Sequence, residues 1–315
     1  MDAVAEAFEH AIAGLVDAVA GVAPAWLVLG VVFHLLNQVA RGIGWHAVVE
    51  AACEDGTAPR KRHSVAAWVA GAGAGGVVSA RGGDAVRVLV LNRRTPEAGG
   101  ALLTGTLVAE CVGETAIGGA LLAFGLAVGL GPSFGLSTST LFYVPAVLLV
   151  AVGAYLLARR SVRVRRFLAK AAHGCALLRC PKAYSRQVLP WQLLSRVLRL
   201  VALGCFLAAF GLPATPAAVL LVVFAQSSGR LVPFSPASVG AGAAILAATF
   251  GPITGDTVSA SHVAAFFVGT STVLTVIGTV LALVICAQAS AKAGPNPLTV
   301  LGRLMRMRPA TAPRP

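Results

Sequence analysis

Two glutamates, Glu110 and Glu114, are four residues apart in an otherwise apolar stretch of the chain. This spacing places both carboxylates on one face of a helix. A carboxylate inside an apolar segment is unfavourable unless it is paired, and Arg41, Arg81 or Arg87 could supply the partner. Two roles stay open for the glutamates: an ion pair that holds helices together, or direct handling of a substrate or proton.

The second candidate for chemistry is the segment 81–87, with the sequence RGGDAVR. Its two glycines allow the chain to turn, and Asp84 suits the N-cap or first turn of a following helix. A helix N-terminus flanked by Arg81 and Arg87 can bind an anion such as phosphate. The alternative is that both arginines anchor a helix end at the membrane interface.

A similar break occurs later in the chain, at residues 230–236, with the sequence RLVPFSP. Ser235 suits an N-cap and is followed by proline at the first helical position. Arg230 lies just before it. If both breaks meet near the middle of a membrane, two helix N-termini and the arginines at 81, 87 and 230 would face one cavity.

The elements that position these residues must be membrane helices. Hydrophobic residues make up 57% of the 315 residues and charged residues 12%, with a mean hydropathy of +0.81. A soluble domain has about 25% charged residues. Backbone groups in a bilayer must be hydrogen-bonded internally, and no alternating strand pattern occurs. The predicted fold class is therefore an all-α, polytopic integral membrane protein, and a soluble or disordered chain is excluded.

Three regions are expected: an amphipathic interfacial helix at 1–22, a transmembrane domain at 23–290 and a basic cytoplasmic tail at 291–315. Full spans are predicted at 24–45, 101–130, 139–158, 191–212 and 262–287. The apolar runs near 64–91 and 216–250 are interrupted, and their pieces are shorter than the roughly 20 residues that a span needs. We expect each to form a re-entrant helix pair. The order span, pair, span then occurs twice around one linking helix, which predicts an inverted repeat with its binding site at the interrupted helices.

The net charge of +13 is distributed unevenly along the chain. The segment 159–190, predicted as a loop, carries nine basic residues and no acidic residue. Because basic loops stay on the cytoplasmic side, this segment and the tail are placed in the cytoplasm and the protein in the inner (plasma) membrane. The charge is therefore an orientation signal, and no nucleic-acid partner is expected. We also expect no metal and no cofactor, since His34 lacks a second ligand at suitable spacing.

In four short motifs the sequence resembles the flippase-like membrane domain of the lysylphosphatidylglycerol synthase transmembrane family. The resemblance covers roughly 24–290 and depends on the order of four short motifs. These are Arg41-x3-Trp45, RGGDAVR at 81–87, Glu110-x3-Glu114 and LVPFSP-x3-G at 231–240. The family usually has proline where Ser79 stands, arginine where Cys111 stands and glutamate near Ala243.

The resemblance implies a lipid-translocating membrane domain, and no segment outside the spans of this sequence is long enough for an aminoacyl-transferring domain. We expect the protein to bind or translocate an anionic lipid or lipid-linked glycan headgroup. The headgroup candidates are Arg81, Asp84, Arg87, Arg230 and Ser235, with Arg41, Glu110 and Glu114 as charge partners.

The alternative is a non-transporting scaffold for a lipid-modifying enzyme or glycosyltransferase, docked through 159–190. An enzyme is not expected because no catalytic motif is convincing. Membrane lipids are the expected partners, with a membrane enzyme or a second copy of the chain as further candidates.

Overall fold

The computed structural model describes residues 21–53, 57–77, 80–127, 162–228, 237–254 and 258–292. These residues form helices and no strand, which confirms the all-α fold class. In chain order the α-helices are α2 (Pro24–Ala52), α3 (Lys61–Val77), α4 (Ala80–Arg94), α5 (Gly100–Ala127), α7 (Val162–Gly174), α8 (Pro181–Gln187), α9 (Leu189–Ala209), α10 (Pro216–Ser228), α11 (Ala237–Thr254) and α12 (Ala260–Lys292). Two short 3-10 helices, η1 (Pro96–Ala98) and η2 (Ala176–Arg179), lie between them.

Four of these helices, α2, α5, α9 and α12, are long and apolar enough to cross a membrane. They correspond to four of the five predicted spans, and the fifth, 139–158, lies outside the described residues. Local sequence sets their ends. Pro24 occupies the first turn of α2, where its missing N–H costs no hydrogen bond. Gly211, just after α9, has φ 67°, a conformation that glycine adopts readily when it ends a helix.

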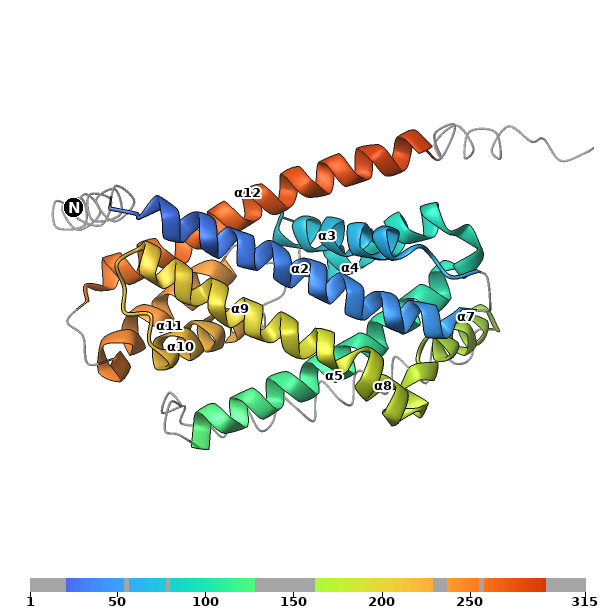
Figure 1. Ribbon diagram of the computed structural model, residues 1–315, viewed down its shortest axis with the longest axis horizontal. Coiled ribbons are helices and arrows are strands. Elements are labelled where there is room, and N and C mark those ends of the chain that lie inside the picture. Colours follow the sequence, from blue (N-terminus) through green and yellow to red (C-terminus); the bar gives the residue numbers. More distant parts are fainter. Residues whose placement is uncertain are drawn as a thin grey trace, which may run out of the picture.

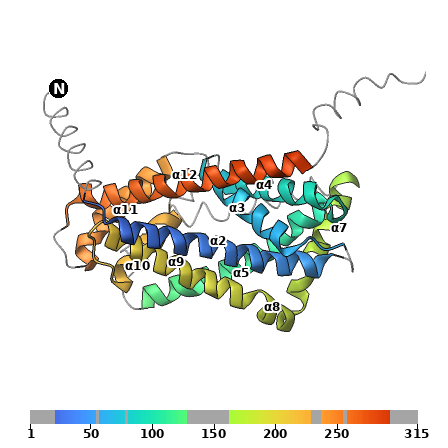
Figure 2. The same cartoon turned by 45° about the horizontal axis from the view of Figure 1, so that its top comes forward.

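Two shorter helix pairs pack beside the long helices (Figures 1 and 2). Helix α2 runs beside α9, and α12 runs along α3 on another side of the molecule. In both views the pair α3/α4 and the pair α10/α11 lie towards opposite ends of the long axis. The interrupted apolar runs therefore each form two packed helices, as the sequence indicates.

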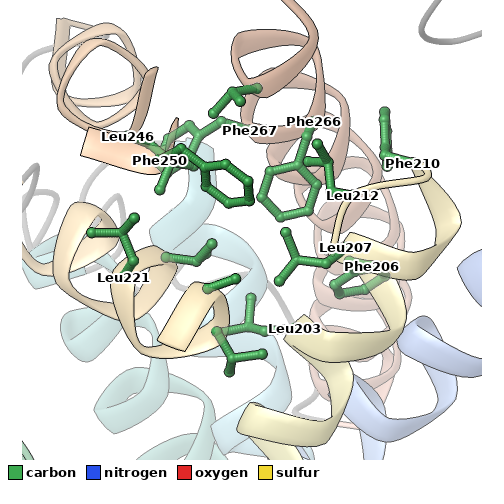
Figure 3. Packing of buried hydrophobic residues seen from close by; sticks show 14 of the residues in the cluster. Leu203, Phe206, Leu207, Phe210, Leu212, Leu221, Leu246, Phe250, Phe266 and Phe267 are labelled. Carbon is green, nitrogen blue, oxygen red and sulfur yellow. The ribbon is translucent and has the colours of Figure 1, made fainter. Parts of the chain in front are cut away.

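An apolar core fixes the second pair against α9 and α12 (Figure 3). The rings of Phe250 of α11 and Phe266 of α12 face each other in this core, and Leu207 of α9 belongs to the same cluster. The rings of Phe210 and Phe266 meet edge to face, with their centroids 5.6 Å apart. Such pairs stabilise packing beyond the burial of their area. This half of the molecule is held mainly by apolar contacts.

Small residues bring the helices of the first half close together. A Cβ atom built on Gly83 of α4 would lie within 2.3 Å of the Gly71 carbonyl oxygen of α3. A Cβ on Gly73 would lie within 1.9 Å of the Gly278 carbonyl oxygen of α12. Only glycine permits these approaches, as is usual where membrane helices pack through small residues.

Two features of the chain differ from the prediction. Helix α3 ends at Val77 and α4 begins at Ala80, so the segment 81–87 lies within a helix and Asp84 is not its N-cap. The sequence predicts a loop over 159–190, but its described part folds into α7, η2, α8 and the first residues of α9. Its basic residues alternate with apolar residues at helical spacing, and an amphipathic helix needs no long apolar run. The expected helix at 1–22, the break at 230–236 and the tail fall almost entirely outside the described residues.

The close approach of α3 and α12 gives a stability prediction. Replacing Gly73 with alanine forces the two helices apart, so the free energy of unfolding should fall by about 1–3 kcal/mol. Gly119 of α5 is the matched control, because a Cβ there meets nothing within 4 Å among the described residues. Denaturant unfolding of the purified protein in detergent measures both variants. Equal stability of G73A and wild type would contradict this packing.

Candidate functional site

Six charged residues gather where four helices meet, and we call them the central charge cluster. They come from α2, α4, α5 and α9. The members are Arg41, Asp84, Arg87, Glu110, Glu114 and Arg196. Their positive and negative charges are equal in number, which is the arrangement that lets ionised groups persist in an apolar segment.

Glu110 is held by two arginines from different helices. Arg41 Nη2 of α2 donates to Glu110 Oε1 at 3.3 Å, and Arg87 Nη1 of α4 lies 3.7 Å from Oε2. Arg87 Nη2 also pairs with Asp84 Oδ1 of its own helix at 3.0 Å. The side chains of Arg87 and Glu110 are each only 10% exposed, so these pairs are largely shielded from water.

Glu114, one helical turn further along α5, is held from both sides. Its Oε2 atom lies 3.3 Å from Arg41 Nη2 and 2.5 Å from Arg196 Nη2 of α9. Arg196 also donates to the Glu114 carbonyl oxygen at 3.1 Å. The Arg41 Nη2 atom therefore bridges both glutamates, and the cluster connects α2, α5 and α9 through one set of charges.

Two tryptophans form a wall of the cluster. The Arg87 guanidinium lies 3.5 Å from the Trp68 ring centroid and 5.7 Å from that of Trp45. The Trp45 Nε1 atom donates to Thr106 Oγ1 at 3.0 Å, and Trp68 Nε1 donates to Gln38 Oε1 at 3.1 Å. These hydrogen bonds fix both rings, and their faces attract the cation.

A chain of hydrogen bonds connects the cluster to α8. Tyr184 donates its hydroxyl to Gln192 Oε1 at 3.2 Å, and Gln192 Nε2 donates to the Glu110 carbonyl oxygen at 3.4 Å. Burial raises the pKa of the Tyr184 phenol and the charges of Glu110 and Glu114 raise it further, whereas the hydrogen bond to Gln192 lowers it. The phenol is thus a neutral donor at physiological pH.

The cluster keeps hydrogen-bonding capacity that no described residue uses. The Nε atoms of Arg41, Arg87 and Arg196 are buried and have no hydrogen-bond partner among the described residues, and the same holds for Glu114 Oε1. Buried polar atoms of this kind are rare in folded proteins and call for an explanation. Three donors and one acceptor of the cluster are therefore without a hydrogen bond among the described residues.

A cavity of about 440 Å³ between α4 and α5 reaches the edge of the cluster. Val88, Leu89 and Leu107 give it apolar walls, and Asp84, whose side chain is 49% exposed, lies at its lining. The size is within the usual range of ligand pockets. An apolar chain can occupy such a cavity while a polar group approaches the Asp84–Arg87 pair.

The structure brings together most of the predicted site residues. Arg41 and Arg87 are the partners of the two glutamates, and Asp84 pairs with Arg87. Arg81 lies in the first turn of α4, and its side chain is not described. Arg230 and Ser235 fall outside the described residues, so their meeting with the first break stays a prediction.

Arg196 was not predicted as a site residue, although the sequence contains a pattern that indicates it. Gln192, Arg196 and Arg199 lie at helical spacing inside the predicted span 191–212. Basic residues within a span are as informative as carboxylates. Arg199 donates to Gln226 Oε1 of α10 at 2.8 Å, so this polar face of α9 connects the cluster to the second helix pair.

Comparison with known proteins now decides the family. The family model described as the lysylphosphatidylglycerol synthase TM region matches residues 8–282. The chain belongs to this family. No curated protein and no solved structure gives a match. The chain is thus a multi-pass membrane protein of a lipid-related family, and its central charge cluster lies wholly within the matched region.

A double-mutant cycle tests whether Glu114 and Arg196 act as a pair in this family member. Glu114→Gln and Arg196→Gln each leave a charge without one partner, so each should destabilise the fold, while the double variant should lose less than the sum. We expect a coupling energy of about 1–3 kcal/mol from denaturant unfolding in detergent. Glu97→Gln, at an exposed position of η1, serves as the control. Strictly additive effects would argue against the pair.

Proposed function

We propose that this protein binds an anionic lipid or lipid-linked glycan headgroup and translocates it across the membrane. The observation that carries the proposal is the set of unpartnered atoms in the central charge cluster. Three guanidinium Nε–H groups suit the oxygens of a phosphate, because arginine–phosphate hydrogen bonds are charge-assisted and directional. Glu114 Oε1 can accept a hydrogen bond from a hydroxyl or ammonium group of the same headgroup.

The paired charges would lower the free-energy cost of moving a charged headgroup through the membrane. A bare phosphate in an apolar environment is strongly unfavourable, as is an arginine that loses its partner. In the cluster an incoming phosphate can take the place of a carboxylate on Arg41, Arg87 or Arg196. The displaced carboxylate would then need another cation, which a second arginine of the cluster or an ammonium group of the headgroup can supply. The cavity beside α4 and α5 would hold an apolar chain of the lipid meanwhile.

Several finer features belong to this proposal. The two helix pairs would be re-entrant halves of an inverted repeat that gives access from alternate sides. Arg81 and Arg230 would add to the phosphate contacts, with Ser235 at the second break. No catalytic step is proposed. The sequence shows no ATP-binding motif, so transport would be downhill, ion-coupled or driven by a partner.

The proposed location is the inner membrane with α7, α8 and the C-terminus in the cytoplasm, because these segments are strongly basic. The exposed thiol of Cys180, just before α8, tests this orientation. A membrane-impermeant maleimide should label it in inside-out vesicles and leave it unlabelled in intact cells. A variant with Cys180 replaced by serine sets the background. Labelling from outside the cell would reverse the proposed orientation.

Flux through purified protein tests the function. In proteoliposomes, acyl-chain-labelled phosphatidylglycerol in the inner leaflet is protected from dithionite unless it is translocated. We expect Arg87→Gln to reduce the flux by about tenfold or more, because it removes a cation from the cluster. Arg87→Lys keeps the charge without the flat contact to Trp68 and should lie in between.

Arg93→Gln, at an exposed position of α4, is the control and should keep wild-type flux. Thermal unfolding of each variant shows how much folded protein contributes to the signal. Wild-type flux in both Arg87 variants would refute the role of the cluster. Absence of flux in purified wild-type protein would favour the alternative scaffold. In that case α7, which exposes Phe167 beside Arg165 and Arg166, is the surface that would dock an enzyme.

A further inference from the structure

A second cavity lies apart from the central charge cluster and shares no residue with it. Its volume is about 500 Å³, and it lies between the end of α2 and the starts of α3 and α9, with the end of α8 beside it. The polar and aromatic side chains that line it are His46, Glu50, Lys61, Arg186, Gln187 and Trp191. Four different helices therefore contribute to one pocket.

We expect the cavity to lie at a membrane surface. Span α2 ends and span α9 begins beside it, and Trp191 lies in the first turn of α9. Tryptophan at a span end is typical of the boundary between lipid and water. A Cβ atom built on Gly44 would lie 3.2 Å from Trp191 Cβ, so the two spans pack closely next to the cavity. Its ligand would meet the headgroup layer of the bilayer.

One part of the lining is positively charged. Lys61 and Arg186 are exposed, come from α3 and α8, and neither forms an ion pair with a described carboxylate. Lys61 is also the first residue of α3, a helix of 17 residues, whose N-terminus adds positive potential. The Gln187 amide offers a further neutral donor. This combination suits the oxygens of a phosphate diester.

The cavity also holds a carboxylate that is available to a ligand. Glu50 lies on the same face of α2 as His46, with His46 Nε2 at 3.7 Å from Glu50 Oε2, and its side chain is 64% exposed. The other ring nitrogen of His46 lies 3.1 Å from Ser64 Oγ. The imidazole is thereby held in place. Glu50 supplies a negative charge within the same pocket as the two cations.

We propose that this cavity binds a zwitterionic phospholipid headgroup, with its phosphate diester at Lys61 and Arg186 and its primary amine at Glu50. Pockets of this volume hold ligands of headgroup size. The apolar side chains of Ile43 and Ala47 and the ring of Trp191 contact the glycerol end, where the acyl chains leave for the bilayer. The site goes beyond the proposed translocation, since it binds lipid at the surface whether or not the central charge cluster moves it.

Calorimetric titration of the full chain in a sugar-based, phosphate-free detergent tests the site. The probe is dihexanoylphosphatidylethanolamine, which carries both a phosphate diester and a primary amine. We expect Lys61→Gln and Arg186→Gln each to weaken its binding by about tenfold. Arg179→Gln in η2, which removes an exposed basic residue outside the lining, is the matched control and should bind as wild type.

Glu50→Gln separates the zwitterionic headgroup from a simple anion. It should weaken binding of the phosphatidylethanolamine probe and leave binding of dihexanoylphosphatidylglycerol, which lacks the amine, unchanged or tighter. Two soluble probes, glycerophosphoethanolamine and inorganic phosphate, should bind more weakly than the lipid because they lack acyl chains. Thermal unfolding confirms that each variant is folded, which is expected because all three side chains are exposed.

Four results would overturn the proposal. Equal affinity for the two lipid probes, or no effect of Glu50→Gln, would reduce the site to an anion site. Binding that survives both Lys61→Gln and Arg186→Gln would place the lipid elsewhere. Glycerophosphoethanolamine binding as tightly as the lipid would make the ligand a soluble headgroup. If the wild-type protein binds the phosphatidylethanolamine probe and the Lys61→Gln, Arg186→Gln and Glu50→Gln variants each lose this binding, the site is established. This holds even if the flux experiment shows no translocation.

Discussion

The rest of the structure depends on one constraint: a charge inside an apolar segment must have an opposite charge beside it. Arg41 satisfies this for both Glu110 and Glu114 through a single guanidinium nitrogen, which fixes α2 against α5. Arg196 then fixes α9 against α5, and Arg87 adds α4. A few ion pairs therefore connect four helices. Removing one partner would leave the others uncompensated, which is far less favourable than never having buried them.

The same constraint explains why the two halves of the molecule are built differently. Around α10 and α11 the core is made of leucine and phenylalanine side chains that interdigitate, and little in it can respond to a polar ligand. Around α3 and α4 the helices approach through glycines and meet at charges with unused donors. We infer that the apolar half provides a rigid support. Under the proposed function, the charged half would exchange partners with a headgroup.

Much of this arrangement could be predicted from the sequence, and the exceptions have physical causes. Glu110 and Glu114 were identified because their spacing and apolar surroundings are local properties of the chain. Arg196 was missed because its role depends on how α9 packs against α5, which no local pattern specifies. The start of α4 was placed too late because Gly82 and Gly83 suggest a turn. In the folded protein Gly83 instead lets α4 pack against Gly71 of α3, and this contact outweighs the low helix propensity of glycine.

The central claim is that the charges of the cluster act on a headgroup as well as holding helices together. The most direct measurement is lipid flux through the double variant Glu114→Gln/Arg196→Gln in proteoliposomes. This variant removes an anion and a cation together, so the cluster stays neutral and the fold should survive. We expect a folded protein whose flux falls by about tenfold or more, because the headgroup loses Arg196 as a partner and Glu114 as an acceptor. Wild-type flux from that folded double variant would contradict it and leave the cluster a structural element.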